Sequence, residues 1–213
     1  MAQNIARVER QALCDLLEKL GPDAPTLSGE WTTGDLAVHL VLRESRLDAA
    51  AGNFIKPLSA HRDSVWAKIA AREWPDLIAA LRDGPPKWSP FAIPGVDARA
   101  NLAEMYVHHE DIRRAQPGWA PRPADGERYR ALEANLMRMG RFLLRSSPLT
   151  VRLDPGTGQP FVGRASTKQG SVTVVGSPDE LMLWCFGRES HARVELIGSP
   201  EDVAAIRAAP RGF

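Results

Sequence analysis

The sequence has few cysteines, almost no net charge and no long hydrophobic run. Its two cysteines, Cys14 and Cys185, lie far apart in the chain, which argues against a disulfide framework or a thiolate metal cluster. Basic and acidic side chains number 27 and 26, for a net charge of +1, so the chain lacks the basic excess that nucleic acid requires. No apolar stretch approaches the ~20 residues that span a membrane. We therefore expect no nucleic-acid partner and no membrane partner.

The sequence does have the composition of an ordinary folded protein. Hydrophobic residues make up 44% and charged residues 25% of its 213 residues, which suits one large domain or two small ones with a buried core. Arg7, Glu9 and Arg10 interrupt the region in which a signal peptide would be apolar. We expect a cytoplasmic protein, a monomer or homodimer, that acts on a small molecule.

The first two thirds of the chain have the periodicity of helices. Apolar residues recur every three or four positions, and glycine and proline interrupt the pattern between segments. Thr32 followed by Asp35 is typical of a helix N-terminus. The segment 84–95 has too many glycines and prolines for a helix or a central strand. The expected helices cover about residues 5–20, 32–51, 63–82, 96–115 and 125–145.

The pattern changes to that of strands near Leu149. Two later segments repeat the order strand, Gly, Ser, Pro, acidic residue and helix, with Ser177 and Ser199 as the expected N-caps. We therefore predict an α+β protein with a helical domain over residues 1–146 and a small α/β domain over residues 147–213. The expected strands in the second domain include residues 149–153, 161–164 and 171–175.

The expected helix 96–115 carries the most informative pattern in the sequence. At ~100° per residue, its charged side contains Arg99, Glu110, Arg113 and Arg114. We expect that side to face solvent. The opposite side then faces the bundle, and it carries a polar stripe made of Asn101, Glu104, His108 and Asp111.

A buried carboxylate persists when it is paired or bound to a metal, so the stripe predicts a site. Glu104 and His108 are four residues apart and can reach one ion, whereas His109 falls at the rim of the stripe. In the second expected helix, His39 and Arg43 are polar exceptions on an otherwise apolar face. His39, Glu104 and His108 together make a three-ligand metal site with open positions.

Several residues have more than one interpretation at this stage. His39 is either a ligand or a hydrogen-bonded core histidine, and Arg43 either faces the site or extends to solvent. Asp111 either orients an imidazole N–H or pairs with Arg114. Trp88, in the segment 84–95, either forms a lid over the site or packs against the bundle.

Two motifs resemble the mycothiol-dependent maleylpyruvate isomerase family. EWTTGDLAVHL, at 30–40, is similar to the family's Trp-x-x-x-x-Leu-x-x-His-Leu signature, and AEMYVHHEDIRRA, at 103–115, to its Glu-x-x-x-His-x-x-Asp segment. The segment LMLWCFGR, at 181–188, loosely resembles its C-terminal domain. The run VHHEDIRRAQPGW, at 107–119, is similar to an actinobacterial metal-binding branch of the family.

The resemblance implies a DinB-like four-helix bundle, with an extra helix here, followed by a sterol-carrier-like α/β domain. It implies a divalent metal, usually zinc, on His39, Glu104 and His108, and mycothiol as the thiol cosubstrate. The expected function is then isomerisation or S-transfer on a small electrophilic or anionic substrate. Arg43, Asp111 and Arg188 are the candidate catalytic residues, and Arg43 and Trp88 the candidate cofactor-binding residues. A non-catalytic metal- or small-molecule-binding protein and a metal-activated hydrolase remain alternatives.

Overall fold

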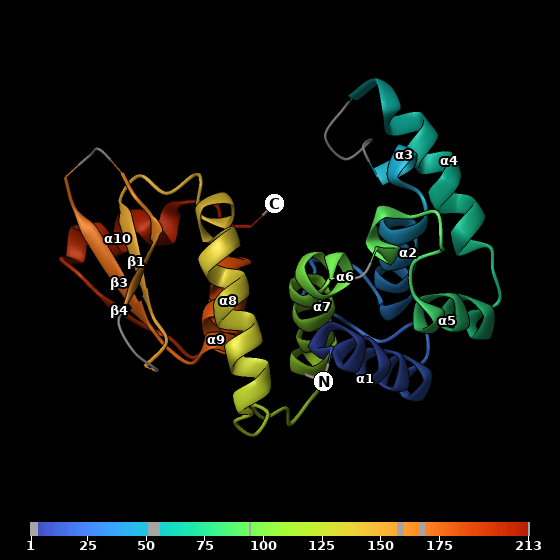
Figure 1. Ribbon diagram of the computed structural model, residues 1–213, viewed down its shortest axis with the longest axis horizontal. Coiled ribbons are helices and arrows are strands. Elements are labelled where there is room, and N and C mark those ends of the chain that lie inside the picture. The colour runs from blue at the N-terminus through green and yellow to red at the C-terminus, as the bar shows by residue number, and fades with distance from the viewer. Residues whose placement is uncertain (1–3, 51–55, 94, 157–159, 167–168, 213) are drawn as a thin grey trace. The chain divides into compact units, whose positions relative to one another are not determined.

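The structure is a computed structural model that describes residues 4–50, 56–93, 95–156, 160–166 and 169–212. It combines helices with one mixed sheet, as the predicted α+β class requires (Figure 1). The chain divides into two compact units, Met1–Pro121 and Arg122–Phe213. Within the described residues, no helix is long and apolar enough to cross a membrane.

Unit 1 is helical, and it carries all of the predicted metal ligands. Helix α1 packs against α7 and α5, and α2 packs against α5 and α4. The turns η2 and η3 are single 3₁₀ turns between these helices. The elements are α1 (Ile5–Leu20), α2 (Thr33–Ser45), α3 (Leu47–Ala50), η2 (Lys56–Leu58), α4 (Ser59–Ala70), α5 (Trp74–Asp83), η3 (Pro90–Ala92), α6 (Val96–Ala100) and α7 (Leu102–Ala115).

Three of the expected helices are each divided into two. Arg46 leaves helical geometry, at φ −139°, and so separates α2 from α3. Helix α5 begins anew with Pro75 in its first turn, a position where the missing N–H of proline costs nothing. Asn101 separates α6 from α7, and at this point Arg43 donates a hydrogen bond to the Ala100 carbonyl. The capping pair Thr32 and Asp35 is present as predicted.

The core of unit 1 consists of apolar side chains from α1, α2, α3, α4, α5 and α7. Burying one leucine completely stabilises the fold by roughly 1.5–3 kcal/mol, so these contacts dominate its stability. The fully buried members of this core are Leu13, Cys14, Leu17, Leu36, Ala37, Leu40, Ala49, Leu81, Met105 and Ile112.

Buried ion pairs cross this apolar core. The guanidinium of Arg10, on α1, donates two hydrogen bonds of 2.6 Å to the carboxylate of Glu44, on α2, and both side chains are 4% exposed. Arg10 also donates to the Leu81 carbonyl. Glu9, the neighbour of Arg10, lies 3.0 Å from the His109 ring on α7. Polar contacts therefore join α1 to both helices that carry the predicted ligands.

Unit 2 contains a four-stranded sheet with the order β2-β1-β3-β4. Strands β1 and β3 are parallel, whereas the β1–β2 and β3–β4 pairs are antiparallel. Helix α8 lies beside α9 and contacts β2 (Figure 1). The elements are α8 (Gly126–Leu143), β1 (Thr150–Asp154), β2 (Phe161–Arg164), β3 (Ser171–Val175), α9 (Pro178–Cys185), η4 (Glu189–His191), β4 (Glu195–Ile197) and α10 (Pro200–Ala208).

Helix α8 belongs to unit 2, so the observed division at residues 121/122 differs from the predicted boundary at 146/147. Its apolar face, with Leu132 and Leu136 fully buried, packs within this unit. A Cβ atom on Gly140 would lie 3.3 Å from Gly163 of β2, so glycine permits this close approach of helix and strand. Helical periodicity identifies such a helix but not the domain that it joins.

The two predicted serine N-caps differ in the structure. Ser199 accepts a hydrogen bond from the Asp202 backbone N–H at the start of α10. Ser177 occupies the N-cap position of α9, but its hydroxyl donates to the Asp179 carboxylate instead.

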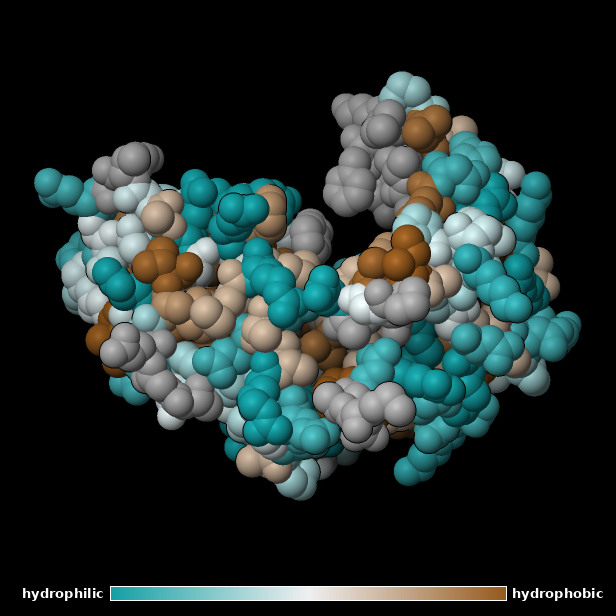
Figure 2. Space-filling model, viewed as in Figure 1, coloured by the Kyte–Doolittle hydropathy of each residue, from teal (hydrophilic) through white to brown (hydrophobic). Residues whose placement is uncertain are grey.

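On the face shown in Figure 2, hydrophilic residues predominate and hydrophobic ones are scattered, which is ordinary for a protein surface.

Candidate metal centre

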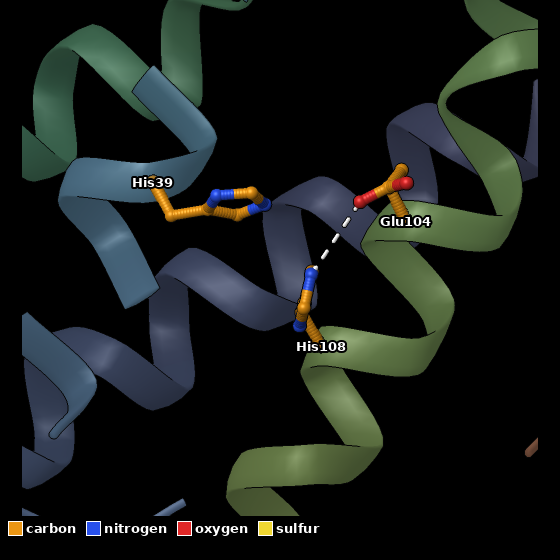
Figure 3. A group of neighbouring side chains, drawn as sticks. All are labelled: His39, Glu104 and His108. Carbon is orange, nitrogen blue, oxygen red and sulfur yellow. Dashed lines mark ion pairs between the residues drawn. The ribbon is translucent and has the colours of Figure 1, made fainter. Parts of the chain in front are cut away.

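His39, Glu104 and His108 converge in unit 1. His39 comes from α2, and Glu104 and His108 come from successive turns of α7. Each offers one ligand atom, and these three atoms lie within 4.8 Å of one another. In Figure 3, the imidazole of His39 points toward the two α7 side chains. The structure thus brings together the three residues that the sequence predicts as ligands.

The spacing of these atoms is compatible with a tetrahedral metal ion. Zinc ligands at about 2.0–2.1 Å from the ion lie about 3.4 Å from one another. The Nε2 atom of His108 is 3.4 Å from Oε2 of Glu104, which matches that separation. The ligand atom of His39 lies within 4.8 Å of those of Glu104 and His108. The side chains of Glu104 and His108 are 14% and 10% exposed, so the site is sheltered yet reachable.

Asp111 orients His108. Its Oδ2 atom lies 2.9 Å from Nδ1 of His108 and accepts a hydrogen bond of 2.9 Å from the hydroxyl of Ser28. Because Nδ1 is bonded to the carboxylate, Nε2 is the atom that faces Glu104. Metal-ligating histidines typically hold their second nitrogen in this way. Of the two interpretations of Asp111, the geometry favours the one in which it orients an imidazole.

Charge within the site affects each ligand differently. Burial, together with the neighbouring His108, lowers the pKa of His39 to about 4, so its imidazole is neutral at pH 7. Burial alone would raise the pKa of Glu104, but the hydrogen bond with His108 and the charge of Arg43 lower it to about 2. Both side chains are therefore already in the protonation state that a metal ion requires.

His108 is the exception among the three. Burial alone would lower its pKa, but the hydrogen bonds with Asp111 and Glu104 outweigh burial and raise the pKa to about 9. Without a metal ion, His108 is thus an imidazolium held between two carboxylates at neutral pH. A divalent cation placed between His39, Glu104 and His108 would replace that proton with a larger positive charge.

Arg43 contacts the site through Glu104. Its Nε atom is 3.7 Å from Oε1 of Glu104. Its terminal nitrogens donate to the Asn101 side chain and the Ala100 carbonyl, and the guanidinium lies 4.8 Å from the ring centre of Phe91. The structure therefore places Arg43 facing the site, with contacts within the protein that fix its position.

The prediction that the charged side of α7 faces solvent is wrong for two of its residues, Glu110 and Arg114. Glu110 is 0% exposed and Arg114 is 2% exposed. Glu110 accepts hydrogen bonds of 2.7 Å from Arg114 and Arg113, and the guanidinium of Arg114 lies 4.8 Å from the ring centre of Trp119. Because the opposite charges pair one turn apart, these side chains are buried without an isolated charge.

His109 is also buried rather than at a rim. It is 6% exposed and its Nδ1 atom lies 3.0 Å from the Glu9 carboxylate. It is not part of the group of ligand atoms formed by His39, Glu104 and His108.

Sequence reasoning missed Ser28 and Trp31, which lie in the loop before α2 and contact Asp111 and His39, and it missed Trp66 of α4, which contacts Trp31. The ring of Trp31 lies 5.2 Å from that of His39, and Trp66 lies 5.7 Å from Trp31. Ser28, in the same loop, holds Asp111. The one sequence feature that could have pointed to these contacts is the position of Trp31 at the start of the motif WTTGDLAVHL, which also contains His39.

Trp88 and Arg188 are the two remaining candidate residues. Trp88 is 66% exposed in the segment before α6. Arg188 belongs to unit 2, where its guanidinium donates to the Phe186 carbonyl. The assignments of Trp88 and Arg188 to the site stay predictions. Burial raises the pKa values of Cys14 and Cys185 to about 12, which makes both thiols poor nucleophiles.

No family model and no curated protein matches the sequence. Two solved structures match it over 92% of this chain and 90% of theirs, each with a TM-score of 0.57. Both are of a mycothiol-dependent maleylpyruvate isomerase, one of them a histidine-to-alanine mutant. The chain shares the fold of that isomerase. At 17% and 14% sequence identity, the likeness to the isomerase shows the fold alone.

Proposed function

We propose that this protein binds a divalent metal ion, zinc in the first instance, and uses it with a thiol cosubstrate. The proposed ligands are His39, Glu104 and His108. The proposed reaction is isomerisation or S-transfer on a small electrophilic or anionic substrate, with mycothiol as the thiol. The proposed location is the cytoplasm.

The observation that carries the proposal is the convergence of the three ligand atoms within 4.8 Å, with Asp111 behind one of them. Two imidazoles and one carboxylate leave coordination positions for an exogenous ligand, as catalytic zinc sites do. A histidine held by a carboxylate is the usual supporting arrangement at such sites. The shared fold makes a thiol-dependent isomerase the best precedent for this arrangement.

The residues of the site have separable roles in this proposal. A bound metal ion would supply the positive charge that lowers the pKa of a thiol and so favours the nucleophilic thiolate. Asp111 holds the proton on Nδ1 of His108 and leaves Nε2 as the ligand atom. Arg43 offsets part of the negative charge of Glu104. The positive charge of Arg43 also suits an anionic group on the substrate.

In the proposed isomerisation, the thiol adds to an activated double bond of the substrate. The new single bond rotates, and elimination restores both the double bond and the thiol, so the reaction has no net redox change. In the S-transfer variant the carbon–sulfur bond remains. Both variants require the same thiolate, which is why one metal site serves either.

The hydrolase alternative fits the geometry less well. It requires Asp111 to act as a base toward water, but Asp111 is 0% exposed and is bonded to both His108 and Ser28. A buried carboxylate that already holds two donors is poorly placed to accept a proton from water.

Metal content and thiol-dependent turnover test the proposal. We expect about one zinc ion per chain in protein purified without chelator. His39→Ala and His108→Ala should lose the metal, because each removes one of three protein ligands. His61→Ala is the matched control, since His61 is a half-exposed histidine bonded to Asp48.

Turnover of an electrophilic alkene should require mycothiol, stop with a chelator and return with added zinc. Metal binding without any effect of thiols would contradict the proposed reaction while leaving the metal site intact. In that case, ester or amide turnover without thiol would indicate the hydrolase, and no turnover would indicate a metal- or small-molecule-binding protein without catalysis.

A further inference from the structure

The loop between α1 and α2, residues 21–32, contacts His39 directly and contacts Asp111, the residue bonded to His108. The hydroxyl of Ser28 donates to Oδ2 of Asp111 at 2.9 Å, and the same oxygen lies 2.9 Å from Nδ1 of His108. Three residues later, the ring of Trp31 lies 5.2 Å from the imidazole of His39. A single short loop therefore reaches one histidine through a carboxylate and the other by ring contact.

This loop forms hydrogen bonds with the C-terminal part of α7 and with the beginning of α2. The Leu27 backbone N–H donates to the Asp111 carbonyl at 3.1 Å, and the Gln116 side chain donates to the Pro25 carbonyl at 3.1 Å. At its other end, Thr32 caps α2. The loop thus connects the second half of α7 to the beginning of α2 by hydrogen bonds at several points.

That connection matters because the two ligand-bearing helices pack on different neighbours. Helix α2 packs against α4 and α5, and α7 packs against α1. The separation of His39 from His108 therefore depends on whatever ties α2 to α7. Helix α1 and the side chain of Arg43 each contact both helices, and the loop adds a further link that reaches Asp111 and His39 themselves.

We propose that Ser28 and Trp31 are positioning residues for the metal site, an inference that rests on the proposed metal binding. Ser28 fixes the Asp111 carboxylate, which fixes the plane of the His108 ring. Trp31 limits the rotation of the His39 ring about its side-chain bonds. Together they restrict the two imidazoles to orientations close to those that one ion requires, so that less order has to be imposed when the ion binds.

Cobalt(II) is a suitable probe, because its visible absorption reports coordination geometry. We expect Ser28→Ala to weaken Co²⁺ binding about tenfold, the lower end of the range for residues that orient ligands. The visible band of the complex should also shift or lose intensity. Ser28→Thr keeps a hydroxyl and should retain most of the affinity.

Ser177→Ala provides the matched control, because it also removes a serine–aspartate hydrogen bond, here with Asp179 of unit 2. Its Co²⁺ affinity and spectrum should equal those of the wild type. Equal affinity and an equal spectrum in Ser28→Ala would overturn the role of Ser28. A wild-type protein that binds no Co²⁺ would overturn the proposed function itself, so the two failures are distinguishable.

Trp31→Phe and Trp31→Ala test the ring contact separately. We expect a graded loss of Co²⁺ affinity, with Phe retaining more than Ala, because Phe still packs against the imidazole. Circular dichroism establishes that each variant is folded, and if Trp31→Ala does not fold, Trp31→Phe decides alone. Wild-type affinity and spectrum in a folded Trp31→Phe would then remove Trp31 from the proposal.

Discussion

Acidification from pH 8 to pH 6 should weaken metal binding through one side chain, His108. Its pKa is raised to about 9, so it is protonated in the metal-free protein throughout this range, and the proton must leave before Nε2 binds a metal. The affinity therefore rises with pH and falls as the solution is acidified. His39, with a pKa of about 4, is neutral in this range and adds no pH dependence.

The two pKa values set the size of the effect. Competition by one proton at a pKa of about 9 reduces the apparent affinity about 90-fold between pH 8 and pH 6. A histidine with its ordinary pKa, about 6.5, would give a reduction of only about fourfold. Glu104, with a pKa of about 2, stays ionised and contributes nothing in this range.

Calorimetric titration with zinc in buffers of different ionisation enthalpy measures the number of protons released. We expect about one proton per zinc ion at pH 7, and a slope near one when the logarithm of affinity is plotted against pH. Asp111→Asn removes a carboxylate that raises the pKa of His108, so its slope should be shallower. Release of no proton, or of two, would refute this description of the site.

Three further outcomes concern stability. Glu44→Ala should lower the free energy of unfolding by about 3–5 kcal/mol, because it removes the carboxylate that neutralises the buried guanidinium of Arg10; urea denaturation measures this, with exposed Glu30→Ala as the control. Leu136→Ala, at a fully buried position of α8, should cost about 2–5 kcal/mol and lower the melting temperature. Gly170→Ala should also lower it, because Gly170 has φ +106° and an added Cβ would lie 2.5 Å from Oδ1 of Asp202; an unchanged melting temperature would contradict that geometry.

The sequence indicates most elements of this fold but not their divisions. Alternation of apolar and polar residues locates β1, and Thr32 with Asp35 marks the beginning of α2. The breaks at Arg46 and Asn101 escape detection because the apolar periodicity continues across them. At Asn101 the cause is tertiary, since Arg43 bonds to Asn101 and Ala100 from another helix.

The three candidate metal ligands are predictable for a different reason. Glu104 and His108 share one face of one helix, and His39 interrupts an apolar face of another. The burial of Glu110 was not predictable from angles alone, because a helical wheel treats every charge as solvated and ignores pairing with Arg114. Ser28 lies in a loop that has no periodicity to interpret, so its contact with Asp111 emerges only in the folded chain.

The three candidate ligands come from two helices that depend on different parts of the fold. Glu104 and His108 stand one turn apart on α7, so local helix formation alone presents two donors to an arriving cation. His39 reaches the same point from α2, and only correct tertiary packing brings it there. For the proposed metal site, we therefore expect the rate of ion entry to depend mainly on α7 and the residence time of the ion to depend on how firmly α2 and α7 are held together.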